Sequence, residues 1–165
     1  MAKRDATGPV TLSVLDRLID SEPKNRSEVP LTRAQSLREL KLALKRDLEW
    51  LLNTRKTIDP SPDSARETNR SVYHYGFADI SSRSVLSARD HTDLVREMES
   101  AIAVFEPRLK RARVRMEQVE GSYRTLNFVI EGLLCMDPTP EPVRFDTVLE
   151  LGKGEYEIKG DGLAQ

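Results

Sequence analysis

The feature of this sequence that most constrains its fold is a change in the spacing of apolar residues at Pro107. Five apolar residues before it fall on one side of a helix: Leu94, Met98, Ala101, Ile102 and Phe105. After it, Ala112, Val114 and Met116 alternate with charged residues, which is the period of a strand with one buried face. Proline has no backbone N–H and does not continue a helix. The sequence therefore predicts a helix that ends before Pro107 and a sheet that begins after it.

The rest of the chain keeps the strand period. Turn-forming residues at 120–122, 138–142 and 152–154 separate four alternating segments. The apolar-face positions of the last three are Leu126, Phe128, Ile130, Leu134, Val143, Phe145, Thr147, Leu149, Leu151, Tyr156 and Ile158. Such a sheet is marginal by itself, so helices are expected to cover its apolar face. The predicted fold class is α+β: a two-layer domain with amphipathic helices packed on a mainly antiparallel C-terminal β-meander.

A long amphipathic helix is predicted from Thr32 to about Asn53. Thr32 and Gln35 match a capping box, in which each side chain accepts a hydrogen bond from the other residue's backbone N–H. The buried ridge of this helix is expected to be Leu37, Leu40, Leu44, Leu48 and Leu51. Charged residues beside the ridge, including Arg46 and Asp47, indicate a solvated face. Trp50 is placed either at the rim of the core or on a contact surface.

Residues 71–79 are predicted to form one or two helical turns after a Pro-containing breaker at 59–64. Gly76 is expected to end them, because glycine takes the left-handed conformation without a Cβ clash. Val72, Tyr75 and Phe77 are expected in the core.

Residues 10–19 form a separate short amphipathic segment, followed by a charged linker. Its apolar stripe is Val10, Val14, Leu15, Leu18 and Ile19. A helix this short is marginal in water and needs a partner surface. Docking on its own domain and docking on another protein are both open. The predicted organisation is a mobile tail over 1–9, this helix and linker over 10–29, one domain over 30–159 and a tail over 160–165.

Composition and charge exclude several classes of protein. Lys and Arg number 26 against 27 Asp and Glu, and aromatic residues make up 5%, which argues against a general nucleic-acid binder. No apolar stretch approaches the roughly 20 residues that cross a bilayer, so a cytoplasmic location is expected. The lone Cys135 lies in an apolar run and is predicted to be a small core residue. The basic face formed by Lys110, Arg111, Arg113 and Arg115 is interpreted as solvated or as facing an acidic partner.

Three ordered motifs carry a resemblance to a known family. They are the sequences at 13–18 (Ser-Val-Leu-Asp-Arg-Leu), at 75–79 (Tyr-Gly-Phe-Ala-Asp) and at 105–109 (Phe-Glu-Pro-Arg-Leu), with a later strand at 143–147. The set resembles the TssE family of type VI secretion baseplate subunits, related to phage-tail wedge proteins that are historically labelled lysozyme-like. The resemblance spans about Val10 to Ile158.

The resemblance implies a structural role. Members sit in the baseplate wedge with TssF, TssG and TssK, and contribute to the platform on which the TssB/TssC sheath polymerises. It implies partner-binding roles for Glu106, Pro107 and Arg108, and for the N-terminal motif residues Val14, Leu15, Asp16, Arg17 and Leu18. The family's C-terminal sheet resembles the strand-exchange domain of the sheath subunits.

The alternative function is a peptidoglycan hydrolase, as the historical label suggests. Glycoside hydrolysis uses two carboxyl groups, one of them kept protonated. Phage-type lysozymes carry a Glu followed nine positions later by an Asp, and no Glu of this chain has an Asp at that offset. Glu106 is expected to pair with Arg108, which makes it a poor general acid. The only histidines, His74 and His91, lack metal-ligand spacing, so no metal, cofactor or catalytic residue is predicted.

Overall fold

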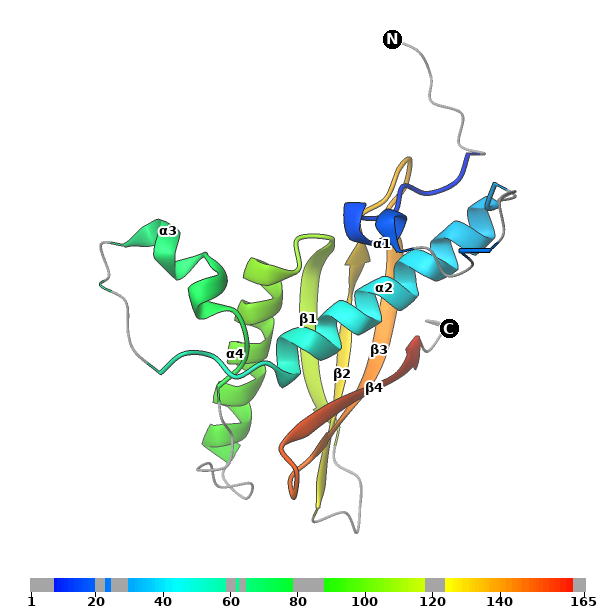
Figure 1. Cartoon of the computed structure of the whole chain (residues 1–165). Helices are drawn as coiled ribbons and strands as arrows, with labels where there is room; N and C mark the ends of the chain where they lie inside the picture. The colour runs from blue at the N-terminus through cyan, green and yellow to red at the C-terminus, as the bar shows by residue number, and fades with distance from the viewer. Residues whose placement is uncertain are drawn as a thin grey trace.

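The computed structural model describes residues 8–19, 23–24, 30–58, 62, 65–78, 88–117 and 124–161 of the chain. Helical elements precede the strands, and the predicted α+β class is confirmed (Figure 1). The elements are α1 (Val14–Leu18), α2 (Arg33–Asn53), α3 (Arg66–Asn69), the 3-10 turn η1 (Val72–His74), α4 (Ala88–Phe105), β1 (Leu109–Glu117), β2 (Thr125–Leu134), β3 (Glu141–Glu150) and β4 (Glu155–Asp161). The predicted turn at 120–122 lies outside the described residues.

The sheet is an antiparallel meander. Its strand order is β1-β2-β3-β4, so each strand pairs with the next along the chain and β1 and β4 form the two edges. Ile130 pairs with Val114 on one side and with Phe145 on the other, which aligns the apolar face across three strands. This register follows from the alternation of apolar residues, since a shift by one residue would turn every side chain to the other face.

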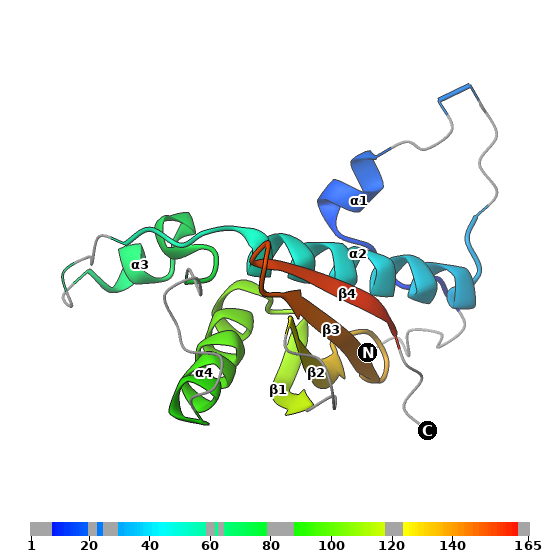
Figure 2. The ribbon, with the colours of Figure 1, turned by 90° about the horizontal axis from the view of Figure 1, so that it is seen from below.

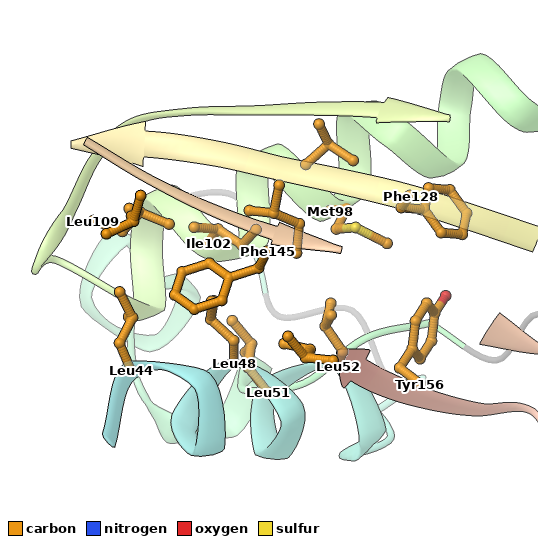
Figure 3. Close-up of a cluster of buried hydrophobic side chains, with 14 of the residues drawn as sticks. Leu44, Leu48, Leu51, Leu52, Met98, Ile102, Leu109, Phe128, Phe145 and Tyr156 are labelled. Atoms are coloured by element: carbon orange, nitrogen blue, oxygen red, sulfur yellow. The ribbon is translucent and has the colours of Figure 1, made fainter. Parts of the chain in front are cut away.

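The core lies between this apolar face and the two long helices. Leu44, Leu48 and Leu51 of α2 point toward Phe145 of the sheet, and Met98 and Ile102 of α4 fill the adjoining space (Figure 3). Each of these side chains is almost completely buried. Burial of one such side chain contributes about 1.5–3 kcal/mol. The helices thus give the meander the covering layer that its pattern requires.

The ends of both long helices lie where the sequence predicts them. Thr32 and Gln35 form the capping box at the start of α2, and the helix ends at Asn53. α4 ends at Phe105, two residues before Pro107. The alternation in β1 begins directly after this junction.

The prediction for residues 71–79 is correct for Gly76 and Phe77 and wrong for Val72. Gly76 has φ +112°, and a Cβ there would lie 2.4 Å from the Thr54 carbonyl oxygen. Phe77 is buried, because backbone hydrogen bonds with Thr54 and Lys56 hold it at the end of α2. Val72 lies before this anchor, at the start of η1, and is 88% exposed.

The prediction that Cys135 is a core residue was wrong, because its thiol side chain is exposed. Leu134 ends β2 and is fully buried, and the next residue along a strand points to the opposite side. The Cys135 backbone N–H donates to the Arg108 carbonyl oxygen across 2.7 Å. The alternation of side chains along β2, and not the apolar run, determines that the Cys135 side chain is exposed.

Candidate functional site

The turn between α4 and β1 brings Arg108 back over Glu106. The Leu109 N–H donates to the Glu106 carbonyl oxygen across 3.1 Å, which closes the turn around the exposed Pro107. Arg108 Nε donates to Glu106 Oε1 at 2.7 Å, and Nη2 donates to Oε2 at 2.6 Å. Glu106 is only 5% exposed. The predicted pair therefore exists, and both of its carboxylate oxygens are occupied by one guanidinium.

Arg108 also reaches α2. Its Nη2 donates to Asp47 Oδ2 across 2.5 Å, so the same guanidinium joins two carboxylates from different elements. The hydrogen bond to Glu106 is the largest cause that raises the pKa of Arg108, and Asp47 adds to it, although burial opposes the shift. A guanidinium held in this way is oriented before any partner arrives.

The ion pairs continue from α2 to α1. Arg46 donates to Asp47 Oδ1 at 2.9 Å through Nε and to Asp16 Oδ1 at 2.9 Å through Nη2. Ser13 Oγ caps α1 and donates to Asp16 Oδ2. Burial favours a higher pKa for Asp16, but the hydrogen bonds from Ser13 and Arg46 outweigh it and lower that pKa. We call this set the ionic network: Asp16, Arg46, Asp47, Glu106 and Arg108.

The network resolves how α1 is attached. Val10 is buried and its N–H donates to Ser36 Oγ of α2 at 2.8 Å, while the Asp16 side chain is 9% exposed. The apolar stripe of α1 is not covered: Val14, Leu15, Leu18 and Ile19 are 71%, 50%, 77% and 53% exposed. Figure 2 shows α1 on the side of α2 that faces away from the sheet. The polar side of α1 is thus anchored within the chain, and its apolar side is open.

The outer face of α2 adds exposed apolar groups next to this contact. Leu42 and Trp50 lie one turn before and one turn after Arg46, and they are 49% and 53% exposed. The Arg46 guanidinium lies over the Trp50 ring, 4.9 Å from its centroid. We call Val14, Leu15, Leu18, Ile19, Leu42 and Trp50 the apolar surface.

A sequence profile of the family described as baseplate wedge protein gp25 matches residues 38–139, more than half of the chain. The chain belongs to this family. The resemblance inferred from its motifs is therefore confirmed at the level of the baseplate wedge family. No curated protein matches the sequence.

The range matched by the family profile includes only part of the ionic network. Asp47, Glu106 and Arg108 lie inside the matched range, and Asp16 with the rest of α1 lies before it. The structure nevertheless joins all four through Arg46. The N-terminal motif and the junction motif, separated by about half of the chain, are thus joined by one set of ion pairs.

Sequence reasoning missed Arg46 and Asp47 as members of this site and placed them on a solvated face. Their side chains are 29% and 23% exposed, and both are bound in ion pairs. No pattern within α2 marks them, since a charged residue beside a leucine ridge is normally solvated. Nor does the sequence show that Arg108, already expected to pair with Glu106, has a second carboxylate partner 61 positions away.

Glu106 is not arranged as a general acid. Both oxygens of Glu106 accept hydrogen bonds from Arg108, so neither is positioned to donate a proton. Within the described ranges no three His, Cys, Asp or Glu side chains converge on a position for a metal ion. In the same ranges no helix is long and apolar enough to span a membrane.

Proposed function

We propose that this chain is a non-catalytic structural subunit of a type VI secretion baseplate, of the TssE type. It would be assembled in the cytoplasm at the inner face of the inner membrane. Membership of the baseplate wedge family supports the structural role. The ordered motifs at 13–18, 75–79 and 105–109 support the type VI assignment.

The observation that carries this proposal is the apolar surface beside the ionic network. Three apolar side chains of α1 are at least half exposed next to a fully paired set of charges: Val14, Leu15 and Leu18. Exposed apolar groups with a preoriented arginine and an exposed tryptophan are typical of protein interfaces. Asp16 and Arg17 lie between Leu15 and Leu18 in the same motif, and Asp16 anchors α1 through its ion pair with Arg46. We propose that the wedge proteins TssF, TssG and TssK dock here.

The junction motif then acts through Arg108. Glu106 is buried and its carboxylate is bound to Arg108, so its proposed role is to orient that guanidinium. Pro107 is exposed at the tip of the turn. Arg108 keeps 24% of its side chain exposed and can offer this part to a partner carboxylate.

The meander is the proposed contribution to the sheath platform. Its antiparallel sheet presents one outer face and two edges. The resemblance to the TssE family implies that such a sheet contributes to the platform for the TssB/TssC sheath. Strand addition to a sheet edge uses main-chain hydrogen bonds for affinity. The subunit would thus join the wedge through its helices and the sheath through its sheet.

The test uses two exposed apolar residues of the same chain. Leu18→Asp changes the apolar surface at a position that is 77% exposed, and Val72→Asp makes the same kind of change in η1 at 88% exposure. We expect both variants to fold, and only Leu18→Asp to lose co-purification with TssF and TssG. Retention of the complex by Leu18→Asp, or equal loss by Val72→Asp, would contradict the proposed surface.

Cell-wall digestion separates the proposal from the hydrolase alternative. The purified chain is expected to release no soluble fragments from peptidoglycan. Turnover that is abolished by Glu106→Gln would replace the structural proposal with an enzymatic one.

A further inference from the structure

The outer edge of β4 is occupied by side chains of α2. An edge strand leaves alternate N–H and C=O groups without a ladder partner. Asn53 Oδ1 accepts from the Tyr156 N–H at 2.8 Å, and Asn53 Nδ2 donates to the Tyr156 carbonyl oxygen at 2.9 Å. Glu49 Oε1 accepts from the Ile158 N–H at 2.9 Å. Asn53 therefore makes the same reciprocal pair of hydrogen bonds that a residue of a neighbouring antiparallel strand would make.

The far end of β4 is interrupted by a bulge. Phe145 pairs with Asp161 and Asp146 pairs with Lys159, so Gly160 is an extra residue in β4. Gly160 has φ +46°. A bulge bends the edge and interrupts its repeat of hydrogen-bonding groups. The regular part of the edge is thus the part that Asn53 and Glu49 hold.

The opposite edge of the sheet carries a similar arrangement. Glu99 Oε1 of α4 accepts from the Val114 N–H of β1 at 2.9 Å. The register of β1 shifts between Lys110 and Arg113, where Arg111 has φ +54°. Each edge of the described sheet therefore combines a helix side chain with a bulge.

We infer that Asn53 and Glu49 keep the β4 edge closed in the free subunit, and that an extended strand of a partner displaces them. The closure is a property of the free chain, while its release by a sheath protein rests on the proposed function. We place the opening at the β4 edge because one of its two closing residues, Asn53, is the last residue of α2, where a helix frays, while Glu49 lies one turn inside the helix. Glu99 lies inside α4 and is held by the turns on both sides.

The charges of β4 indicate the partner. Glu155, Glu157 and Lys159 are exposed and alternate with the buried Tyr156 and Ile158. A second copy of β4 aligned at Tyr156 would place Glu155 opposite Glu157, and one aligned at Glu157 would place two Glu157 side chains opposite each other, which is unfavourable. An extended segment with Lys or Arg on this face and apolar residues on the other is the complementary occupant.

A peptide titration of the full chain tests this. The probe is a short synthetic peptide in which lysine and valine alternate, and binding is measured by fluorescence anisotropy. The double variant Asn53→Ala, Glu49→Ala is expected to bind it about tenfold more tightly than the unmodified chain, which corresponds to about 1.4 kcal/mol, because the peptide no longer has to displace the side-chain hydrogen bonds of Asn53 and Glu49. A second peptide with a central proline cannot pair along the edge and should show no gain.

Two variants serve as controls. Lys45→Ala removes the ion pair of Glu49, 3.8 Å away, and leaves the bonds to β4 in place. Glu99→Ala opens the β1 edge only, where the exposed Arg113 and Arg115 repel the lysines of the peptide. Neither is expected to raise the affinity for the peptide, and an equal rise in either would overturn the inference.

Hydrogen exchange decides the remaining outcomes. The amides of Tyr156 and Ile158 should exchange faster in the double variant, with Ile130 in the sheet centre unchanged. Faster exchange at Tyr156 and Ile158 without tighter binding of the peptide would overturn the inference. So would an equal rise in affinity for the proline-containing peptide. If the double variant does not fold, Asn53→Ala alone is put through the same titration and judged by the same outcomes. No wedge or sheath protein is used, so failure here is distinct from failure of the proposed function.

Discussion

Arg108 in the turn after α4 and Asp47 in the middle of α2 are joined by a hydrogen bond of 2.5 Å, although they are 61 positions apart. The bond ties the junction motif to the helix that also carries α1. Arg108 therefore has two intramolecular carboxylate partners before it meets another protein. Changes to this residue are therefore expected to affect the fold as well as the proposed assembly.

Arg108→Ala is expected to destabilise the isolated chain by about 3 kcal/mol, because it leaves the buried Glu106 carboxylate without its partner. Urea denaturation followed by circular dichroism measures the difference. Arg113→Ala is the matched control, since Arg113 is 77% exposed and lies 3.7 Å from Glu99, and it should change stability by about 0.5 kcal/mol or less. Equal stability of both variants would contradict the role given to the network.

Asp16→Ala is expected to release α1 without unfolding the domain. Asp16 is the α1 residue that binds Arg46, and its loss removes that ion pair and the hydrogen bond with Ser13. The amides of Arg17 and Ile19, which hydrogen-bond within α1, should exchange faster, while those of α2 keep their protection. Unchanged exchange in α1 would show that the contacts of Gly8 and Val10 with α2 hold the segment without Asp16.

Acidification should weaken the same anchor. The pKa of Asp16 is lowered from its ordinary value of 3.8 in the folded chain. The unfolded chain therefore takes up the proton first, so this stabilisation is present above about pH 4 and is lost as pH falls through the folded pKa. Hydrogen exchange of α1 from about pH 6 to pH 3 follows this loss. In Asp16→Asn, the protection of the α1 amides should no longer depend on pH in this range. If the pH dependence is the same as in the unmodified chain, a group other than Asp16 causes the loss.

Trp50→Ala tests the α2 part of the apolar surface. Trp50 is half exposed, so its removal should cost the free chain only about 0.5–1 kcal/mol, chiefly from the contact with Arg46. Affinity for the wedge proteins should fall by about 2 kcal/mol or more, as for a central aromatic anchor. Calorimetric titration measures both this variant and Tyr73→Ala, whose residue is 43% exposed in η1. Similar losses for the two variants would argue against a localised interface.

Gly76→Ala should destabilise the fold by about 1–3 kcal/mol, because the residue has φ +112° and its new Cβ would meet the Thr54 carbonyl oxygen. Gly152→Ala is the control, since a Cβ there meets nothing within 4 Å. Thermal unfolding of both variants gives the comparison. Equal midpoints would mean that the segment after α2 relaxes without cost.

Much of the fold follows from local patterns. The change of period at Pro107, the capping box at Thr32 and the alternation through Phe145 correspond to α4, α2 and the meander. These predictions succeed because each depends on residues a few positions apart. The failures at Val72 and Cys135 have the opposite cause. Both residues lie in apolar surroundings along the sequence. Val72 is exposed because the chain is held at Phe77 instead, and Cys135 is exposed because it follows the buried Leu134 and points to the opposite side.

The sequence by itself determined the bounds of α2, the end of α4 and the succession of strands after it, and it marked Glu106 and Arg108 as a local pair. Only the tertiary structure decided that Asp47 completes this pair, that Arg46 joins it to Asp16, and that Asn53 occupies the edge at Tyr156. These contacts depend on how α2 crosses the sheet, and that crossing is set by the packing of the whole core. Short-range patterns encode which face of an element is buried, but not which distant polar group the other face will meet.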